Sequence, residues 1–380
     1  MKKLFWLGLT GLLLFEVANV YFIMPMPGSQ QMNSIDTAYF LYKWRWVFRG
    51  VFGVMIIAGL FKARWRPRRK WWLLLPVVIV AAVIYMANFK MAADHMFYQP
   101  RKVVMLTAAA NKVDPGRLVI GVVNNGEARA YPIQFLGYHH QVQDTIGGKP
   151  LIVTYCTVCR TGRVFEPVVN GRPEKFRLVG MDHFNAMFED ATTGSWWRQV
   201  SGEAIAGTLK GQRLPEVFST QTSLAKWLEL NPGSLIMQAD PVFANSYPKT
   251  ARYEDGQSRD ELTGTDSLSW KNKSWVIGVK AGDERKAYDW NELKAKRLIA
   301  GNIGKTPVLL VLANDNKSFF AFERPDYSNV FFLHGDTLLY RSRFFRIDGK
   351  GLDTTYSLKR LPAYQEFWHS WQTFNPGTEK

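Results

Sequence analysis

The sequence predicts a mainly β protein of two related β-rich lobes with few short helices, preceded by a three-helix transmembrane anchor. Three observations support this prediction. Apolar runs alternate with basic residues in the first 90 positions, short apolar runs separated by turn residues fill the rest, and the rest repeats itself at a fixed offset. We therefore divide the 380 residues into an anchor over 1–90, lobe one over 91–250 and lobe two over 251–380.

The anchor contains three apolar runs, at about residues 4–24, 46–62 and 71–89. Each run approaches the ~20 residues with which a helix crosses a hydrocarbon core of ~30 Å. The first run also has the position of a signal peptide. However, Met24-Pro-Met-Pro-Gly ends it without a small-x-small cleavage site, which favours a retained helix.

Positive charge is concentrated in this anchor. Residues 1–90 contain twelve Lys or Arg and only two acids, which is +10 of the formal net charge of +16. Lys62–Lys70 alone holds six of these cations, so the positive-inside rule places this loop and the N-terminus in the cytoplasm. We expect a multi-pass protein of the inner (plasma) membrane with a periplasmic C-terminal domain.

The expected partners follow from the same pattern. The lipid bilayer is the main one, and the partner protein of the membrane helices, if there is one, is not identified by the sequence. No helix-turn-helix, zinc-finger or phosphate-loop signature is present, so a nucleic-acid partner is not expected.

One acidic residue, Glu16, falls in the middle of the first apolar run. A charge at that depth is costly unless it is paired or hydrated, and Arg49 of the second run is the expected partner. This membrane polar pair is interpreted either as a clasp between helices or as a proton or ligand site.

The outer part contains a repeat. Val119-Ile-Gly-Val recurs as Val276-Ile-Gly-Val, and Ile146-Gly recurs as Ile303-Gly, both 157 residues later. The two copies differ in their reactive residues, since Ala313 stands in lobe two where lobe one has Cys156. This difference indicates a functional site in lobe one and a scaffold role for lobe two.

Cys156 and Cys159 are the only cysteines, in Tyr155-Cys-Thr-Val-Cys-Arg-Thr-Gly162. A thioredoxin-like redox pair begins a helix, but here an apolar run precedes the motif and a Pro-containing run follows it. A structural disulfide across so short a loop constrains little of the unfolded chain. A strand, Cys-x-x-Cys, turn and strand suits a metal knuckle. Two unlinked thiols are the remaining interpretation.

A metal site needs ligands beyond two thiolates. His139 lies before the motif on an expected strand and turn, and His183 lies after it. His140 is adjacent to His139, so the two would face opposite sides of a strand. A set of Cys and His ligands suits copper or zinc.

At these residues the chain resembles domain-of-unknown-function family 3179. Thr154-Tyr-Cys-Thr-Val-Cys-Arg-Thr-Gly162 is similar to its Thr-Tyr-Cys-Pro-Leu-Cys-x-Thr-Gly signature, and His139-x-x-x-x-Asp144 followed by Gly147-Gly fits as well. Asn185, the segment Asp190–Trp197 and the segment Gln199–Gly207 complete the pattern. The resemblance is strong over about residues 115–235, weak over lobe two and absent from the anchor. Thr157, Arg160 and His183 depart from it.

The family brings no established activity, but the resemblance implies that its motif residues form one site. We therefore predict a membrane-anchored periplasmic protein that binds copper or zinc through Cys156, Cys159, His139 and His183, surrounded by Asp144, Asn185, Gln199 and Glu203. One alternative is a thiol–disulfide protein in which Cys156 attacks and Cys159 resolves. Another is a non-catalytic binding module with a structural disulfide. The sequence assigns no catalytic residue and does not decide whether the protein is an enzyme.

Overall fold

The computed structural model describes residues 1–62, 72–327, 330–353 and 355–380. The chain forms two compact units. The first unit comprises Met1–Tyr98, Lys175–Arg198 and Glu203–Arg213, and the second comprises Gln99–Glu174, Gln199–Gly202 and Leu214–Lys380. Part of the segment that the sequence assigns to lobe one thus belongs to the same unit as the apolar helices.

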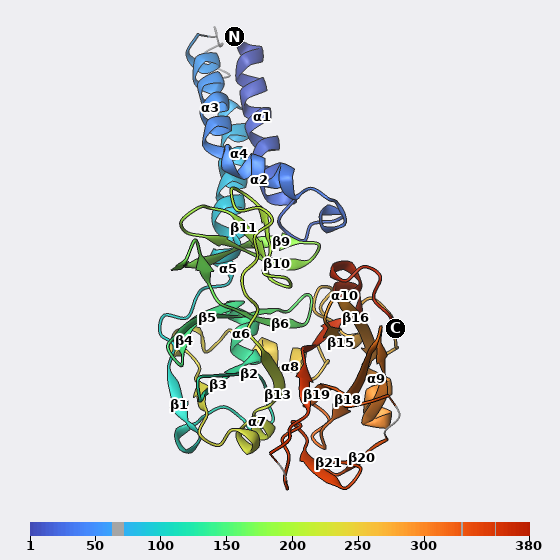
Figure 1. The fold of residues 1–380 in the computed structure, drawn as a ribbon. Helices are drawn as coiled ribbons and strands as arrows, with labels where there is room; N and C mark the ends of the chain where they lie inside the picture. Colours follow the sequence, from blue (N-terminus) through green and yellow to red (C-terminus); the bar gives the residue numbers. More distant parts are fainter. Residues whose placement is uncertain (63–71, 328–329, 354) are drawn as a thin grey trace. The chain divides into compact units, whose positions relative to one another are not determined.

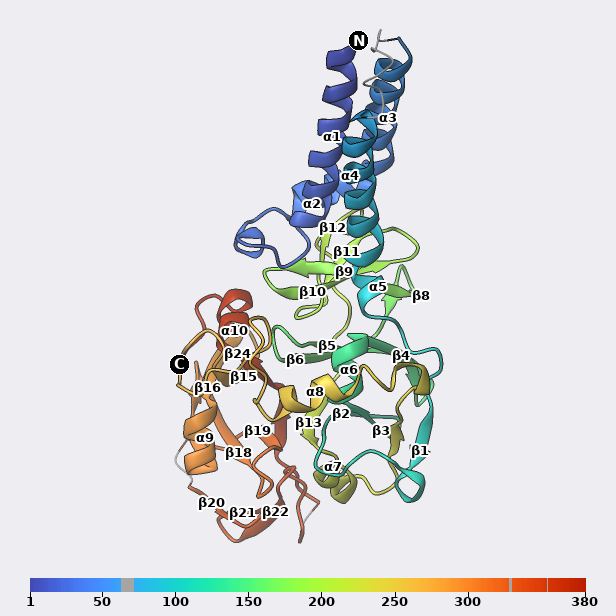
Figure 2. The same cartoon turned by 180° about the vertical axis from the view of Figure 1, so that it is seen from behind.

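The helices of the first unit form a bundle in which α1, α3 and α4 run side by side (Figures 1 and 2). Their order is α1 (Lys2–Tyr21), α2 (Ile35–Lys43), α3 (Arg45–Lys62), α4 (Leu74–Tyr85), a π-helical turn (Met86–Lys90) and the short α5 (Ala93–Met96). A 3-10 turn (Ser29–Gln31) lies between α1 and α2.

Glycines allow α1 and α3 to pack closely. A Cβ on Gly59 of α3 would lie 2.4 Å from the backbone nitrogen of Phe5 on α1, and a Cβ on Gly8 would lie 2.9 Å from Met55. Small residues at such a seam bring two helix backbones together, as in membrane helix pairs. The N-terminal end of α1 therefore lies beside the C-terminal end of α3.

The lengths and compositions of the helices contradict the prediction of three membrane-spanning helices. Within the described residues only α1 is long and apolar enough on its own. Taken together, α2 and α3 are long and apolar enough to cross a membrane, but the chain bends by 60° at the break between them. The apolar stretch Leu74–Lys90 is shorter than a membrane-spanning helix. The basic loop expected over Lys62–Lys70 and the start of the third run lie outside the described residues from position 63 to 71.

A polar triad connects α1, α3 and the π-helical turn that follows α4. Glu16 is fully buried, and its carboxylate accepts hydrogen bonds from Nε (2.6 Å) and Nη2 (2.9 Å) of Arg49. Asn88 donates to the same carboxylate at 3.0 Å and accepts from Arg49 at 2.7 Å. Each group is satisfied by the other two, which makes the buried charges tolerable.

The first unit also contains a four-stranded sheet in the order β12-β11-β10-β9. Its strands are β9 (Phe176–Asp182), β10 (Asn185–Asp190), β11 (Trp196–Arg198) and β12 (Ala204–Ala206). The loop after α1 is tied to this sheet, because Met181 N donates to Ile23 O at 2.7 Å.

In the second unit, lobe one denotes the elements from β1 to α8. Its main sheet has the order β1-β14-β3-β2-β13, and β4-β5-β6 form a second sheet. The strands are β1 (Met105–Thr107), β2 (Leu118–Asn124), β3 (Glu127–Pro132), β4 (Gln141–Ile146), β5 (Lys149–Cys156), β6 (Thr161–Phe165), β7 (Val168–Val169), β8 (Arg172–Pro173), β13 (Ser219–Ser223) and β14 (Leu235–Met237). The helices are α6 (Ile133–His139), α7 (Leu224–Leu230) and α8 (Pro248–Glu254), with 3-10 turns at Ala108–Ala110 and Pro241–Phe243.

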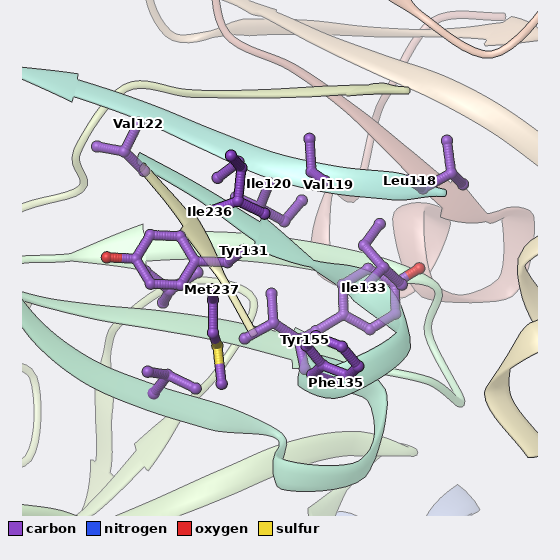
Figure 3. Packing of buried hydrophobic residues seen from close by; sticks show 14 of the residues in the cluster. Leu118, Val119, Ile120, Val122, Tyr131, Ile133, Phe135, Tyr155, Ile236 and Met237 are labelled. Atoms are coloured by element: carbon purple, nitrogen blue, oxygen red, sulfur yellow. The ribbon is translucent and has the colours of Figure 1, made fainter. Parts of the chain in front are cut away.

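The core of lobe one fills the space between its two sheets and α6 (Figure 3). Residues of β2 such as Leu118 and Ile120 pack with Ile236 and Met237 of β14 and with Tyr155 of β5. Burial of these apolar side chains holds the strand that ends in Cys156.

Lobe two denotes the elements from β15 to α10. Its three sheets have the orders β16-β15-β24, β17-β18-β19-β23 and β20-β21-β22. The strands are β15 (Trp275–Ala281), β16 (Glu284–Asp289), β17 (Leu298–Ile303), β18 (Thr306–Leu312), β19 (Phe319–Glu323), β20 (Phe331–His334), β21 (Thr337–Tyr340), β22 (Arg343–Arg346), β23 (Lys359–Leu361) and β24 (Ala363–Phe367). The helices are α9 (Trp290–Lys296) and α10 (Trp368–Phe374).

Elements of the two lobes follow one another in a similar order. The elements β2, β3, α6 and β4 begin 157 residues before β15, β16, α9 and β17. A Cβ on Gly121 of β2 would lie 2.2 Å from the ring of Trp227, and one on Gly278 of β15 would lie 2.0 Å from the ring of Trp371. In each lobe a glycine on the first strand of the pattern makes room for a tryptophan of a later helix.

One local expectation is wrong. His139 ends helix α6, and His140 caps it in the left-handed region (φ 62°), so neither lies on a strand. In lobe two, α10 begins only at Trp368, because the preceding residues pair with β15 as strand β24. The mainly β character is confirmed.

Replacing Gly59 by Leu is expected to lower the stability of the helix bundle by on the order of 1–3 kcal/mol, because the new side chain collides with the backbone of α1. Thermal unfolding of the full chain in detergent micelles, followed by helical circular dichroism, measures this loss. Gly53→Leu is the control, since a Cβ at Gly53 of the same helix meets nothing within 4 Å. Equal unfolding temperatures for the two variants would contradict the packing described above.

Candidate functional site

The Cys-x-x-Cys motif forms the turn of the β5–β6 hairpin. Cys156 pairs with Thr161, so Thr157 to Arg160 make a four-residue loop. Arg160 closes the loop in the left-handed region, with φ of 56°. Both cysteines are thiols and 0% exposed. The motif thus follows a strand, as the sequence predicts, and its sulfur atoms face the protein interior.

Residues of lobe two bind the backbone carbonyls of this turn. Phe367 N donates to Cys159 O at 2.9 Å. The Lys273 ammonium donates to Val158 O at 3.1 Å, and Nε2 of His369 lies 3.1 Å from the same oxygen. The cysteine turn therefore lies at the interface between the two lobes of the second unit.

Arg160 anchors the end of the turn. Its buried guanidinium donates to Gln365 Oε1 at 3.0 Å and to the carbonyls of Tyr253 (3.0 Å) and Glu254 (2.7 Å). It also lies 3.5 Å from the ring centre of Trp275, a cation–π contact. One side chain thus connects the turn to α8, to β24 and to the start of β15.

A second buried arginine completes the interface. Arg163 of β6 forms an ion pair with Glu366 of β24, and both side chains are almost fully buried. Thr161 and Ser370 each donate to the same carboxylate at 2.9 Å. The carboxylate is therefore satisfied from both lobes at once.

The electrostatics of the turn centre on Lys273. Burial lowers the pKa of its ammonium, and the electrostatic interaction with Cys159 and, less strongly, with Cys156 acts in the opposite direction. Burial, followed by the repulsion from Lys273, lowers the pKa of His369 to about 4. His369 is therefore neutral at pH 7, and Lys273 is the cation that both thiols face.

Lys273 also reaches a cavity of about 670 Å³, which the loop before β15 lines with residues that include Asp266, Trp270 and Lys271. Lys273 therefore lines this cavity and also donates to a carbonyl of the cysteine turn.

Sequence reasoning expected His139 to join the cysteines. Its Nε2 shares a hydrogen bond of 2.8 Å with the hydroxyl of Tyr247. Asp144 pairs with Arg129 (2.6 Å) and accepts from Tyr131 (2.7 Å). Gln199 is the motif residue that reaches the hairpin, because its amide donates to Thr154 Oγ1 (3.0 Å) and to Thr161 O (3.1 Å).

The other motif residues belong to the first unit. His183 Nδ1 lies 2.7 Å from Asp182, and this hydrogen bond raises the pKa of the imidazole. Asn185 begins β10 and is buried, and Glu203 accepts from Arg213 at 2.9 Å. Asp190 accepts from Thr193, Ser195 and Trp197, so this part of the motif stabilises a turn.

A metal centre gains no support from the geometry. Within the described parts of the chain, no group of three or more His, Cys, Asp or Glu side chains is close enough to hold a metal ion. The expected copper or zinc ligands Cys156, Cys159, His139 and His183 do not form such a group.

Sequence reasoning missed Lys273, His369 and Glu366, which lie more than a hundred residues from the motif. A signal was nevertheless present. Arg160 and Arg163 stand within an apolar hairpin, and a buried guanidinium requires an acidic or carbonyl partner from another element.

A model of the family described as "Protein of unknown function (DUF3179)" matches residues 99–378. The chain belongs to the DUF3179 family. The match includes the cysteine turn, and it extends through lobe two, where the sequence shows only a weak resemblance. Searches of the curated proteins and of the solved structures gave no match.

Removing the carboxylate of Glu366 is expected to destabilise the second unit by up to about 3–5 kcal/mol, because Glu366→Gln leaves the buried Arg163 with only the partly exposed Glu216, 3.4 Å away, as a counter-ion. Urea unfolding of the full chain in micelles, followed by the circular dichroism of the strands, measures the change. Glu323→Gln is the matched control, since Glu323 pairs with the exposed Lys359 and contributes at most about 1 kcal/mol. A similar small loss for both variants would contradict the role of the buried pair.

Glu254 predicts a pH dependence of stability. Burial raises the pKa of its carboxyl from 4.5 to about 7 in the folded chain. The folded state then binds this proton more tightly than the unfolded state, so stability is full below pH 4.5 and is lost as the pH rises through 7. Between pH 5 and pH 8 the loss is about 2–3 kcal/mol. Urea unfolding at the two pH values should show this loss in the native chain and a smaller loss in Glu254→Gln.

Proposed function

We propose that this DUF3179 protein is a thiol–disulfide protein whose Cys156 and Cys159 form a reversible disulfide. The observation that carries the proposal is the position of both thiols in one tight turn, beside the Lys273 ammonium. A neighbouring cation stabilises a thiolate, which is the reactive form of cysteine. The family description supplies no activity, so the proposal rests on this geometry.

The reaction is an exchange with a protein or low-molecular-weight disulfide. A thiolate attacks one sulfur of that disulfide and releases a thiol, and the second cysteine then displaces the other sulfur. Two electrons and two protons leave the cysteine pair, and the external disulfide becomes two thiols. Lys273 donates to the carbonyl of Val158, the residue directly before Cys159, so we assign the nucleophile to Cys159, the reverse of the sequence-based assignment.

The full burial of the pair favours a switch over a general oxidoreductase. The carbonyls of Val158 and Cys159 are bound by lobe two, so a disulfide that reshapes the turn alters these hydrogen bonds. Oxidation would therefore change the strength of the hydrogen bonds between the cysteine turn and lobe two. A reagent can reach the sulfur atoms only when these hydrogen bonds open.

We further propose that the helices of the first unit anchor the protein in a membrane as a multi-pass bundle. Large apolar side chains of the bundle are exposed, including Leu14, Val54 and Val78 at 61–67%. Lys2 and Lys62 mark one end of the packed α1–α3 pair. That end would face the cytoplasm under the positive-inside rule, and the family region would face the periplasm, where disulfides form.

We also propose that the two lobes arose by internal duplication. The shared order of elements and the equivalent Gly–Trp contacts support this origin. Lobe two has no cysteine and supplies Lys273, His369 and Glu366 instead, which is consistent with a scaffold that holds the reactive turn.

The full chain in micelles, equilibrated with mixtures of reduced and oxidised glutathione, is expected to form the Cys156–Cys159 disulfide in one two-electron transition. Quenching in denaturant with a maleimide and weighing the intact chain measures the oxidised fraction. Lys273→Gln should shift the equilibrium by about tenfold toward the disulfide, because the thiolate loses its cation. Lys271→Gln, which changes a lysine of the same cavity, should leave the transition in place.

Two results would overturn the thiol–disulfide proposal. The first is a pair that stays reduced at every glutathione ratio. The second is stoichiometric copper or zinc in protein purified without chelators, lost in Cys156→Ser, which would establish the metal site instead.

A further inference from the structure

A small cavity of about 190 Å³ lies in the first unit, where the helix bundle meets strand β9. The C-terminal end of α1, the break between α2 and α3, the π-helical turn and α5 also line it. Arg45, one of the lining residues, begins α3, whereas Lys62 ends the same helix, so the cavity lies at the opposite end of the bundle from Lys62. Its volume is below the ~300–1,000 Å³ of a site for a whole ligand, so it suits one chemical group of a larger molecule.

Arg177, one of the two arginines that line the cavity, is already paired. Its Nε donates to Glu189 at 2.9 Å, and its Nη1 donates to Asp94 at 3.0 Å. Its Nη2 donates to Glu189 at 2.6 Å and also to the hydroxyl of Tyr42. Every nitrogen of this guanidinium therefore has a partner inside the first unit.

Arg45 differs from Arg177 in having no acidic partner among the residues that the structure describes. Its Nη1 donates to Tyr42 O at 2.6 Å, and its guanidinium lies 3.9 Å from the centre of the Tyr42 ring. Its Nε and Nη2 have no hydrogen-bond partner in the described ranges, and neither is a buried atom, so a ligand can reach them. Arg49 uses this same edge, Nε with Nη2, to bind both oxygens of Glu16. Arg45 thus presents an anion-binding edge that no side chain occupies.

The surroundings of Arg45 are those of a side chain at the membrane surface. Trp44 and Trp46 flank it and are 48% and 70% exposed. Exposed tryptophans concentrate at the level of lipid headgroups. Along α3, Val47 and Val51 are 54% and 53% exposed, and their spacing places them on one face of the helix. Arg45 therefore lies at the end of an apolar stripe, beside aromatic side chains.

We infer that this cavity binds the phosphodiester group of an anionic phospholipid, with Arg45 as the residue that holds it. Two phosphate oxygens match the free edge of the guanidinium. His95 lines the same cavity and is exposed, so its imidazole can donate a further hydrogen bond to the phosphate. Basic pockets between membrane helices recognise anionic headgroups in this way. The inference rests on the membrane anchor proposed above and is independent of the cysteine pair.

The combination of charge and apolar surface selects the lipid over simpler anions. The acyl chains of the lipid lie along the stripe that begins at Val47, which a free phosphate cannot occupy. A zwitterionic lipid carries an ammonium group next to its phosphate, and this ammonium competes with Arg45 for the phosphate oxygens. A lipid with acyl chains and a net negative charge satisfies both features.

Native mass spectrometry of the full chain, freed of lipid in neutral micelles, tests this inference. The probes are phosphatidylglycerol, phosphatidylcholine with the same acyl chains, and inorganic phosphate. We expect phosphatidylglycerol to saturate at one molecule per chain. Phosphatidylcholine and inorganic phosphate should each bind at least about tenfold more weakly, since the first has no net negative charge and the second has no acyl chain.

Arg45→Gln should weaken the binding of phosphatidylglycerol by about tenfold or more, because it removes the charge-assisted contact. Lys43→Gln is the matched control and should bind as the native chain does. Lys43 is an exposed cation two residues away that does not line the cavity. Helical circular dichroism shows whether both variants keep the native bundle. If Arg45→Gln does not fold, the comparison of the probes on the native chain decides.

Three results would overturn the lipid site: equal affinity for the two lipids, inorganic phosphate binding as tightly as phosphatidylglycerol, or native affinity in Arg45→Gln. The anchor is tested separately with the full chain in vesicles of phosphatidylcholine, from which alkaline carbonate should not extract it. A chain that stays in these vesicles but shows no preference for phosphatidylglycerol disproves the lipid site alone. A chain that carbonate extracts disproves the anchor itself.

Discussion

The buried ion pair between Arg163 and Glu366 is the contact on which the second unit depends. Each charge loses its water on folding, and within its own lobe Arg163 has only the partly exposed Glu216 as an acidic partner, 3.4 Å away. The pair is therefore favourable only when β6 and β24 lie together, and this requirement fixes one lobe against the other. Because Thr161 joins the same network and pairs with Cys156, the arrangement of the lobes also fixes the cysteine turn.

Local patterns predicted much of the β structure. Apolar runs bounded by turn residues became β2, β5 and β18, because such runs bury well on sheet faces. The same patterns failed where pairing decides the outcome. Ala363–Phe367 has a composition that suits a helix or a strand, and its register against β15 selects the strand. His139 was misplaced because Ile133–His139 is too short a helix for its periodicity to be recognised.

The sequence likewise predicted some residues of the candidate site and missed others. The cysteines and their turn follow from adjacent residues, so the sequence located them. Lys273 and His369 reach the turn only through the packing of lobe two, which no spacing in the motif encodes. The metal hypothesis grouped the cysteines with histidines near the motif in sequence, and no group of three such ligands forms among the described residues. His139 is bonded to Tyr247, and the backbone carbonyl of the next residue, His140, accepts from Tyr155 N at 2.9 Å, beside Cys156.

Among the contacts that join the two lobes, two lie at equivalent points. At one, Phe367 N binds the carbonyl of Cys159, and at the other, Ser223 at the matching end of β13 binds Ser318 (2.9 Å) and Asp315 (2.6 Å) in the loop before β19. Only the first point contains sulfur chemistry, and the second is inert to oxidants. A chemical change at the cysteines would alter the first of these contacts, while the second contact and the buried pair between Arg163 and Glu366 would still hold the two lobes together.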